Sequence, residues 1–132
     1  MSEELVFSVE DSIATIRLNR PEKYNAFTPE MLISWADALR FCKDSPAVNV
    51  VVLTGTGKGF CSGGDVGNMK NRSEQSAYMR RQFLTDFVHP IALLLDQMDK
   101  PMIVAVNGVA TGAGMDMALM GDMRIAARSA RF

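Results

Sequence analysis

The chain has 132 residues, of which 14 are basic and 15 acidic, and a formal net charge of −1. With 48% hydrophobic and 22% charged residues it has a globular composition, which argues against disorder, and its length fits one domain. The near-neutral charge gives no electrostatic reason to expect nucleic acid or an anionic membrane surface as a partner. No apolar run reaches the roughly 18 residues that a membrane span needs.

The cysteines and the N-terminal residues indicate the compartment. Cys42 and Cys61 form neither a Cys-x-x-Cys pair nor a disulfide framework. The first residues are acidic and lack the charged-then-apolar pattern of a secretion signal. We therefore expect a cytoplasmic protein. No cluster of His, Cys and acidic residues has the spacing of metal ligands, so no metal site is predicted.

The N-terminal segment predicts a hairpin followed by a helix. Residues 5–9 and 13–18 alternate apolar and polar side chains on either side of a short acidic turn, as half-buried strands do. Thr28 is a favourable helix cap and Pro29 suits the first helical position. We expect this helix to end before Pro46.

The rest of the chain alternates buried strands with helices. Apolar, β-branched runs predict strands at residues 48–54, 102–106 and 123–126. Apolar residues at helical spacing cover most of residues 73–98, where Pro90 should start, break or kink a helix, and a further helix is expected from about Ala113. Strands that alternate with helices predict an α/β fold with parallel strand pairs.

Glycine-rich loops follow two of the predicted strands, at residues 55–67 and 107–116. In parallel α/β sheets ligands bind beyond the carboxyl ends of the strands, so we expect the chemistry at these loops. The first loop is not a phosphate-binding Walker loop, because Gly59 rather than Ser or Thr follows Lys58. It is not a nucleophile elbow either, because Phe60 stands where that motif needs its first glycine.

The second loop has the features of an anion site. Gly112 and Gly114 permit close backbone approach, and the helix that begins there points its free N–H groups at whatever binds. Such a helix start suits an anion or the oxyanion of a polarised carbonyl. Asp116 is either a dipole-favoured acid on a solvated face or an acid/base group beside that site. On pattern alone, Asp65 is a turn or cap residue and the single histidine, His89, is solvated or capping.

Four stretches of the chain resemble the enoyl-CoA hydratase/isomerase family, the crotonase superfamily. They follow the family's order and spacing over essentially the whole chain, at Arg20–Ala26, Lys58–Asp65, Lys100–Gly108 and Gly112–Leu119. The resemblance implies an α/β fold of the crotonase type, a β-β-α spiral over residues 1–132 that corresponds to the N-terminal half of the family fold. Because family members are usually much longer, we expect the spiral to be truncated before their C-terminal helical part and second catalytic acid.

The resemblance also implies roles for particular residues. Gly64 and Ala113 match the positions whose backbone N–H groups form the family's oxyanion hole for a thioester enolate, and Asp116 matches a catalytic acid. The expected contacts to the substrate and its CoA come from Lys23, Asn25, Ala26, Ser62, Gly63, Gly64, Asp65, Val66, Gly67, Gly112 and Gly114. The expected partner is an acyl-CoA thioester, with coenzyme A as part of the substrate and no further cofactor. A homo-oligomer is also expected, since the family forms trimers and hexamers.

Asp116 departs from the commonest family pattern and leaves the reaction open. Typical hydratases carry Glu at the matching position, whereas dienoyl-CoA isomerases resemble this chain in carrying the shorter Asp. One hypothesis is a lyase that adds water to a 2-enoyl-CoA. A second is an enoyl- or dienoyl-CoA double-bond isomerase that uses the same enolate without water. A third is a CoA-binding fragment, without full activity, that acts as part of a larger assembly.

Overall fold

The structure is a computed structural model that describes residues 3–65 and 74–132. Among these residues the main sheet has the order β1-β2-β3-β5-β7 and a small sheet pairs β4 with β6. The strands are β1 (Leu5–Glu10), β2 (Ile13–Leu18), β3 (Val50–Gly55), β4 (Gly59–Cys61), β5 (Met102–Val106), β6 (Val109–Ala110) and β7 (Met123–Ala126). The helical segments are η1 (Pro21–Lys23), α1 (Pro29–Asp44), α3 (Ala77–Phe83), η2 (Leu84–Val88), α4 (His89–Asp96) and α5 (Ala113–Leu119).

The predicted N-terminal hairpin is confirmed. β1 and β2 pair antiparallel, with Leu5 opposite Leu18, around a turn in which Asp11 and Ser12 both have positive φ. Such left-handed backbone is what a two-residue hairpin turn requires, and Asp tolerates it better than most residues. The remaining pairs of the main sheet, β2–β3, β3–β5 and β5–β7, are parallel, as the alternation of strands and helices predicted.

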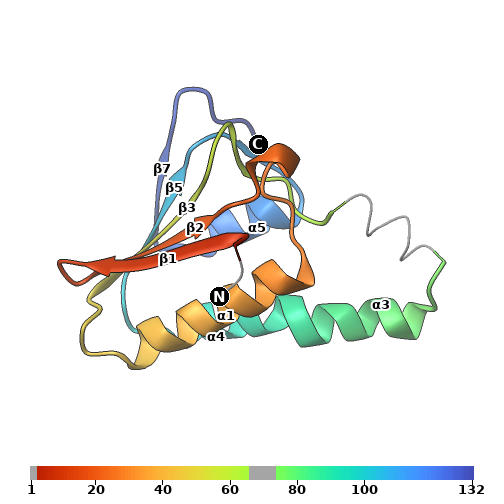
Figure 1. Ribbon diagram of the computed structural model, residues 1–132, viewed down its shortest axis with the longest axis horizontal. Coiled ribbons are helices and arrows are strands. Elements are labelled where there is room, and N and C mark those ends of the chain that lie inside the picture. The colour runs from red at the N-terminus through yellow and green to blue at the C-terminus, as the bar shows by residue number, and fades with distance from the viewer. Residues whose placement is uncertain (1–2, 66–73) are drawn as a thin grey trace.

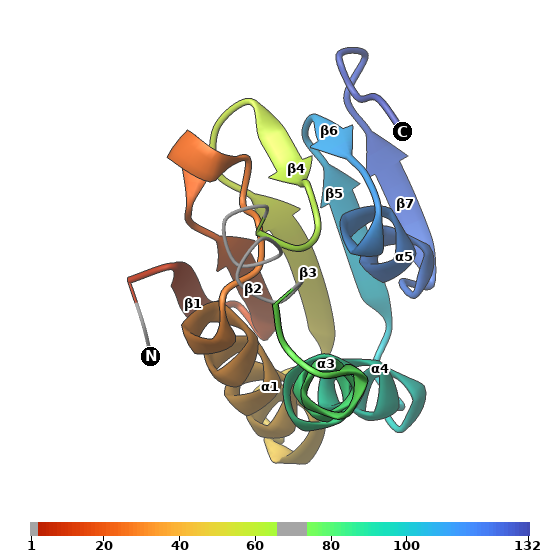
Figure 2. The same cartoon turned by 90° about the vertical axis from the view of Figure 1, so that its right-hand side faces the viewer.

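The chain steps from the main sheet to the small sheet after each of three successive strands. β3 leads to β4 and β5 leads to β6, and these two short strands pair in parallel beside the ends of β3 and β5 (Figure 2). After β7 the chain reaches the same small sheet through a parallel bridge between Val109 and Arg131. This repeated step confirms the expected α/β spiral and brings the loops after β3 and β5 to one end of the molecule.

Helix α1 begins and ends where its sequence predicted. The Thr28 Oγ1 accepts a hydrogen bond from the Met31 N–H at 3.1 Å, and Pro29 occupies the first turn, where its missing N–H costs nothing. At the other end, the Lys100 ammonium group donates to the carbonyls of Cys42 and of the cap residue Ser45, and the helix stops at Asp44. These caps fix α1 against the sheet.

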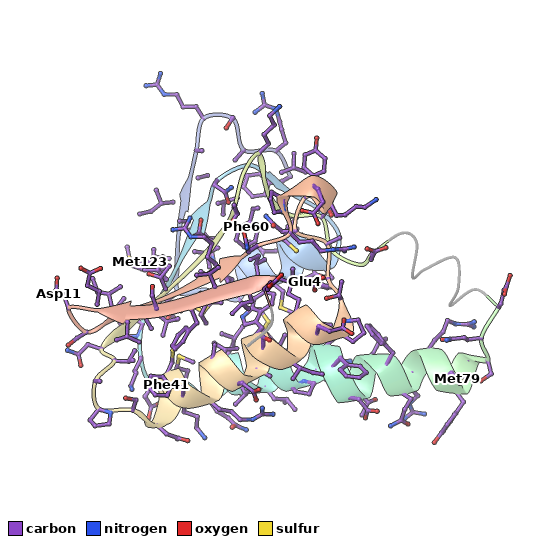
Figure 3. The ribbon with its side chains drawn as sticks, in the orientation of Figure 1. Glu4, Asp11, Phe41, Phe60, Met79 and Met123 are labelled. Carbon is purple, nitrogen blue, oxygen red and sulfur yellow. The ribbon has the colours of Figure 1, made fainter. Side chains whose placement is uncertain are left out.

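In the described part of the chain, helices cover one face of the main sheet and leave the other face open. α1 and α4 lie side by side under the sheet (Figure 1), and Trp35 and Leu39 of α1 are fully buried together with Ile16, Leu53 and Val104 of the strands. At the far edge of the described sheet all four residues of β7 are exposed, and two of them are large and apolar. Figure 3 shows one of them, Met123, at the outer side of the sheet, with Phe60 inside the fold.

Two parts of the secondary structure differ from the predictions. The helical pattern at residues 73–98 becomes α3 and α4 joined by the π-helical turn η2, in which the His89 N–H bonds to the Leu84 carbonyl. Pro90 follows this turn, so the predicted break takes the form of one widened turn. β4 and β6 were not predicted, because strands of three and two residues among glycines carry no period-2 pattern. Within the described ranges, no helix is long and apolar enough to span a bilayer.

Candidate functional site

Asn25 holds the first loop from inside the fold. Its fully buried side chain donates from Nδ2 to the carbonyl oxygens of Thr56, Gly59 and Phe60 at 3.0, 3.0 and 3.1 Å. Its Oδ1 accepts from the Arg20 N–H at 2.8 Å. Asn25 therefore shapes the first loop from a position with no exposed surface, and its expected contact with the substrate or its CoA stays a prediction.

Helix α5 lies directly on β4 because Gly114 has no side chain. A Cβ at Gly114 would lie 2.2 Å from the carbonyl oxygen of Cys61. The Gly114 N–H is already used, since it donates to the Thr111 carbonyl at 3.0 Å. Gly114 is therefore a packing residue in this structure, and its expected ligand contact stays a prediction. Gly112, just before the helix, is exposed and has a φ of +55°, a left-handed conformation that favours glycine.

The two loops meet at Gly63. This residue has a φ of +85°, and a Cβ there would lie 3.1 Å from the amide nitrogen of Ala113. The Thr111 N–H also crosses between the loops, donating to the Cys61 carbonyl at 3.1 Å. Within residues 3–65 and 74–132 no acceptor is found for the N–H of Gly64 or of Ala113. Backbone donors from two separate loops are thus left free close to where the loops touch.

A hollow of about 540 Å³ opens beside this junction. It is lined by η1, the first loop and one residue of the second loop: Glu22, Lys23, Tyr24, Ala26, Ser62, Gly64, Asp65 and Thr111. Ser62 ties the first loop to η1, with its N–H donating to the Tyr24 carbonyl at 3.0 Å and its hydroxyl to the Lys23 carbonyl at 3.2 Å. The structure therefore gathers five of the predicted contact residues around one hollow, namely Lys23, Ala26, Ser62, Gly64 and Asp65.

The remaining predicted contacts lie apart from this lining. Gly63 is buried beneath the hollow, where its carbonyl accepts from the Phe27 N–H at 2.6 Å. Val66 and Gly67 lie outside the described residues. Asp65, taken on pattern as a turn or cap residue, forms an ion pair with Arg20 at 2.5 Å. Sequence reasoning did not single out Arg20, although an Arg next to Pro21 at the end of a strand was visible within the quoted family stretch.

Asp116 lies in the first turn of α5, one turn after Ala113. Its N–H donates to the Gly112 carbonyl at 3.2 Å, and its side chain is exposed. It does not line the hollow. No ion pair or side-chain hydrogen bond of Asp116 is found in the described part of the chain. The carboxylate is thus on the same end of α5 as the free Ala113 N–H, on an open surface.

The other reactive side chains are unsuited to nucleophilic catalysis. Burial raises the pKa of the Cys61 thiol to about 12, although the Gly63 N–H donates to its sulfur, and burial raises that of Cys42 to about 11 against the pull of Lys100. Both thiols therefore stay protonated near neutral pH. His89 is exposed between η2 and α4. The described residues contain no group of three or more His, Cys, Asp or Glu side chains that could hold a metal ion.

Comparisons with known proteins find one matching family and curated relatives that belong to it. The family described as "Enoyl-CoA hydratase/isomerase" matches residues 8–132. The chain is 39% identical over its whole length to the "1,2-epoxyphenylacetyl-CoA isomerase" of Escherichia coli (strain K12), covering 50% of that protein. It is 37% identical over 98% of its length to the "Crotonyl-CoA hydratase" of Syntrophomonas wolfei, covering 49%.

Solved structures agree with these sequence relatives. The crystal structure of a putative enoyl-CoA hydratase/isomerase from Mycobacterium abscessus superposes with a TM-score of 0.90 at 33% identity. That alignment covers 96% of this chain and 49% of the other. The chain therefore spans about half the length of the curated relatives and solved structures that it matches.

Proposed function

On the premise that the chain belongs to the enoyl-CoA hydratase/isomerase family, we propose that the hollow binds an acyl-CoA thioester and that the protein adds water to a 2-enoyl-CoA. The observation that carries this proposal is the pair of free backbone donors, Gly64 and Ala113, contributed by two loops that touch at Gly63. Coenzyme A is part of the substrate, and the proposed reaction needs no further cofactor.

The two free amides suit the charge that develops in such a reaction. When a nucleophile adds to the 2,3 double bond of an enoyl thioester, the thioester oxygen becomes an enolate and gains negative charge. Fixed N–H groups stabilise that charge without reorganising, and one such donor is typically worth about 3 kcal/mol in the transition state. We assign Gly64 and Ala113 to this task, as the two donors of an oxyanion hole.

The lining of the hollow supports a nucleotide-bearing thioester. Lys23 places a cation at the rim, which would attract the phosphates of CoA, while Ala26 and Ser62 supply small side chains along the wall. Small residues let an extended ligand approach the backbone closely. We propose that the CoA portion follows this wall and that the thioester carbonyl points toward Gly64 and Ala113.

Asp116 is the proposed proton-transfer group. In hydration, the water oxygen bonds to C3 of the enoyl chain, the water proton goes to the carboxylate, and a proton is delivered to C2 as the enolate collapses. The exposed side chain of Asp116 lies one helical turn from Ala113, at the same end of α5 as the proposed oxyanion donor.

Double-bond isomerisation is the second candidate reaction. It is favoured by the short Asp116. The 39% identical relative is also named an isomerase, although its named substrate is an epoxide. In double-bond isomerisation the same carboxylate would take a proton from one carbon of the acyl chain and return it to another, with no water added. Hydration is preferred here because the names of several other relatives specify hydratases.

Incubation with crotonyl-CoA and with a 3,5-dienoyl-CoA, followed by liquid chromatography and mass spectrometry, tests the proposal. We expect a gain of one water on crotonyl-CoA, and we expect no new chromatographic peak of unchanged mass from the dienoyl substrate. Asp116→Asn should lower turnover at least about 100-fold while CoA-thioester binding is kept. The matched control is Asp96→Asn, another exposed acid, on α4. Isomerisation without hydration would overturn the hydratase assignment, and binding without turnover would indicate a CoA-binding fragment.

The proposal also covers the compartment and the oligomeric state of the protein. We place it in the cytoplasm and expect it to self-associate, as the trimers and hexamers of the family do. Light scattering after size-exclusion chromatography measures the second point directly, and a monomer at every concentration would contradict it.

A further inference from the structure

Arg20 contacts three segments of the chain from a shielded position. Its side chain is 16% exposed, and its Nη1 donates to Asp65 Oδ2 at 2.5 Å and to the Ala26 carbonyl at 3.3 Å. Its Nε lies 3.7 Å from a carboxylate oxygen of Glu4 and 4.0 Å from one of Glu22. The guanidinium thus joins the start of β1, the segment around η1 and the first loop.

The backbone of Arg20 is fixed as firmly as its side chain. Its N–H donates to the Asn25 side chain at 2.8 Å, and its carbonyl accepts from the Asn25 N–H at 2.9 Å. A guanidinium on such an anchored backbone is pre-organised, so little rotamer freedom is lost when it binds Asp65. The ion pair therefore fixes the first loop relative to the η1 segment.

The Arg20–Asp65 pair differs from the surface ion pair of the same residue types. Both partners are shielded, at 16% and 14% exposure, whereas Arg40 and Asp37 on α1 are 55% and 59% exposed. Solvent screens an exposed pair almost completely but a shielded pair much less. The Arg20 pair can therefore hold a loop in place, and the Arg40 pair serves as its natural control.

We propose that Arg20 is a positioning residue for thioester activation. Asp65 directly follows Gly64, and Ala26 lines the same hollow, so one guanidinium sets the spacing between the wall of the hollow and a carbonyl-binding amide. This inference rests on the proposed function, since it concerns the amide of Gly64. Without the Arg20–Asp65 ion pair, the Gly64 N–H is still available as a donor but is no longer held at a fixed distance from the thioester oxygen.

The expected signature is a loss of activation with binding kept. A misplacement of about 1 Å at a reacting centre lowers turnover by up to about 100-fold, so Arg20→Met should reduce kcat by about 10- to 100-fold and change KM little. Asp65→Asn keeps the volume and removes the charge, and it should give the same change. Arg20→Met also removes the contacts to Glu4, Glu22 and the Ala26 carbonyl. The double variant should therefore be no worse than Arg20→Met alone, because the Asp65 interaction is already lost in that variant.

The test uses crotonyl-CoA labelled with ¹³C at the thioester carbonyl and follows the carbonyl stretch in the complex by infrared difference spectroscopy. The wild-type chain should lower the stretching frequency, Arg20→Met and Asp65→Asn should lose most of that shift while still binding, and Arg40→Met should keep it. Circular dichroism confirms the fold of each variant, and Asp65→Asn stands in if Arg20→Met does not fold. A full shift in a folded Arg20→Met or Asp65→Asn variant overturns the positioning role alone. No shift in the wild-type chain overturns the proposed function and this inference with it.

Discussion

The two sides of the hollow are built in different ways. The first loop is held by side chains from the interior: Asn25 binds three of its carbonyls and Arg20 binds its last described residue, Asp65. The second loop is tied to the first at its start, where the Asn107 side chain donates to the Gly57 and Gly59 carbonyls at 2.9 and 3.0 Å. It then packs its backbone closely at Gly114 and opens onto α5, where Asp116 is exposed.

This difference separates two tasks of the proposed reaction. The amides that would bind the thioester oxygen belong to a rigid interior, whereas the carboxylate that would move protons stands at an open surface. A change in the interior should disturb folding and carbonyl binding together, while a change at the open surface should leave the fold intact.

The largest effect is expected where the two sides touch. Gly114→Ala places a Cβ 2.2 Å from the Cys61 carbonyl, so α5 must move off β4. We expect the free energy of unfolding to fall by about 3 kcal/mol or more, since backbone rather than a flexible side chain has to give way. Urea unfolding followed by circular dichroism measures this loss.

Gly112→Ala is the matched control for that substitution. No atom lies within 4 Å of the added Cβ, and only the φ of +55° opposes the change. The expected cost is about 1–3 kcal/mol, because this φ is combined with a ψ of −133°, a conformation that residues with a Cβ rarely adopt. Equal losses in the two variants would show that α5 does not depend on close packing against β4.

Removing the Asn25 side chain, which holds the first loop from inside the fold, should have the next largest effect. Asn25→Ala removes the side-chain donor of the Thr56 and Phe60 carbonyls, while the Gly59 carbonyl keeps its bond from Asn107. We expect a loss of about 2–3 kcal/mol in the free energy of unfolding. Hydrogen exchange should rise in the first loop and not in α5. Uniform exchange across both loops would contradict the division between the two sides.

The two buried thiols predict that the free energy of unfolding depends on pH. The folded pKa of Cys61 is about 12 and that of Cys42 about 11, both raised from 9.0, so the folded state keeps thiol protons that the unfolded state loses. Stability from this source is complete below pH 9 and falls as pH rises, by about 1.4 kcal/mol per pH unit for each thiol between pH 9 and 11. Urea titrations at pH 8, 9 and 10 should show a flatter slope for Cys61→Ala. An unchanged slope would refute the assignment.

The smallest effect on stability is expected at the exposed strand β7. Ile125 of β7 is 63% exposed, so Ile125→Thr should change the free energy of unfolding by no more than about 0.5 kcal/mol. The same type of exchange at Val104, fully buried on the neighbouring β5, should cost about 2 kcal/mol because it buries a hydroxyl. Thermal melts of the two variants compare them directly, and similar melting temperatures would mean that β7 is covered in solution.

The sequence was informative wherever a local pattern decides the structure. Thr28 and Pro29 mark the start of α1, and the alternation in β1 and β2 marks the hairpin, because caps and period-2 patterns depend on neighbours in the chain. It was less informative where contacts span long separations. The roles of Asn25 and of the Arg20–Asp65 pair depend on residues 31 to 45 positions away, and no local pattern encodes such contacts.

The π-helical turn at Leu84–Val88 has a consequence for how related chains can vary. A π turn corresponds to the insertion of one residue into an α-helix, and one residue rotates everything beyond it by about 100°. α3 extends past the edge of the sheet (Figure 1) and carries the exposed Tyr78 and Met79, so deleting a single codon in this turn would aim those side chains in a new direction. α4, β5 and the second loop would keep their register. An insertion or deletion at this point can therefore change the direction in which α3 presents its side chains without displacing the sheet or the second loop.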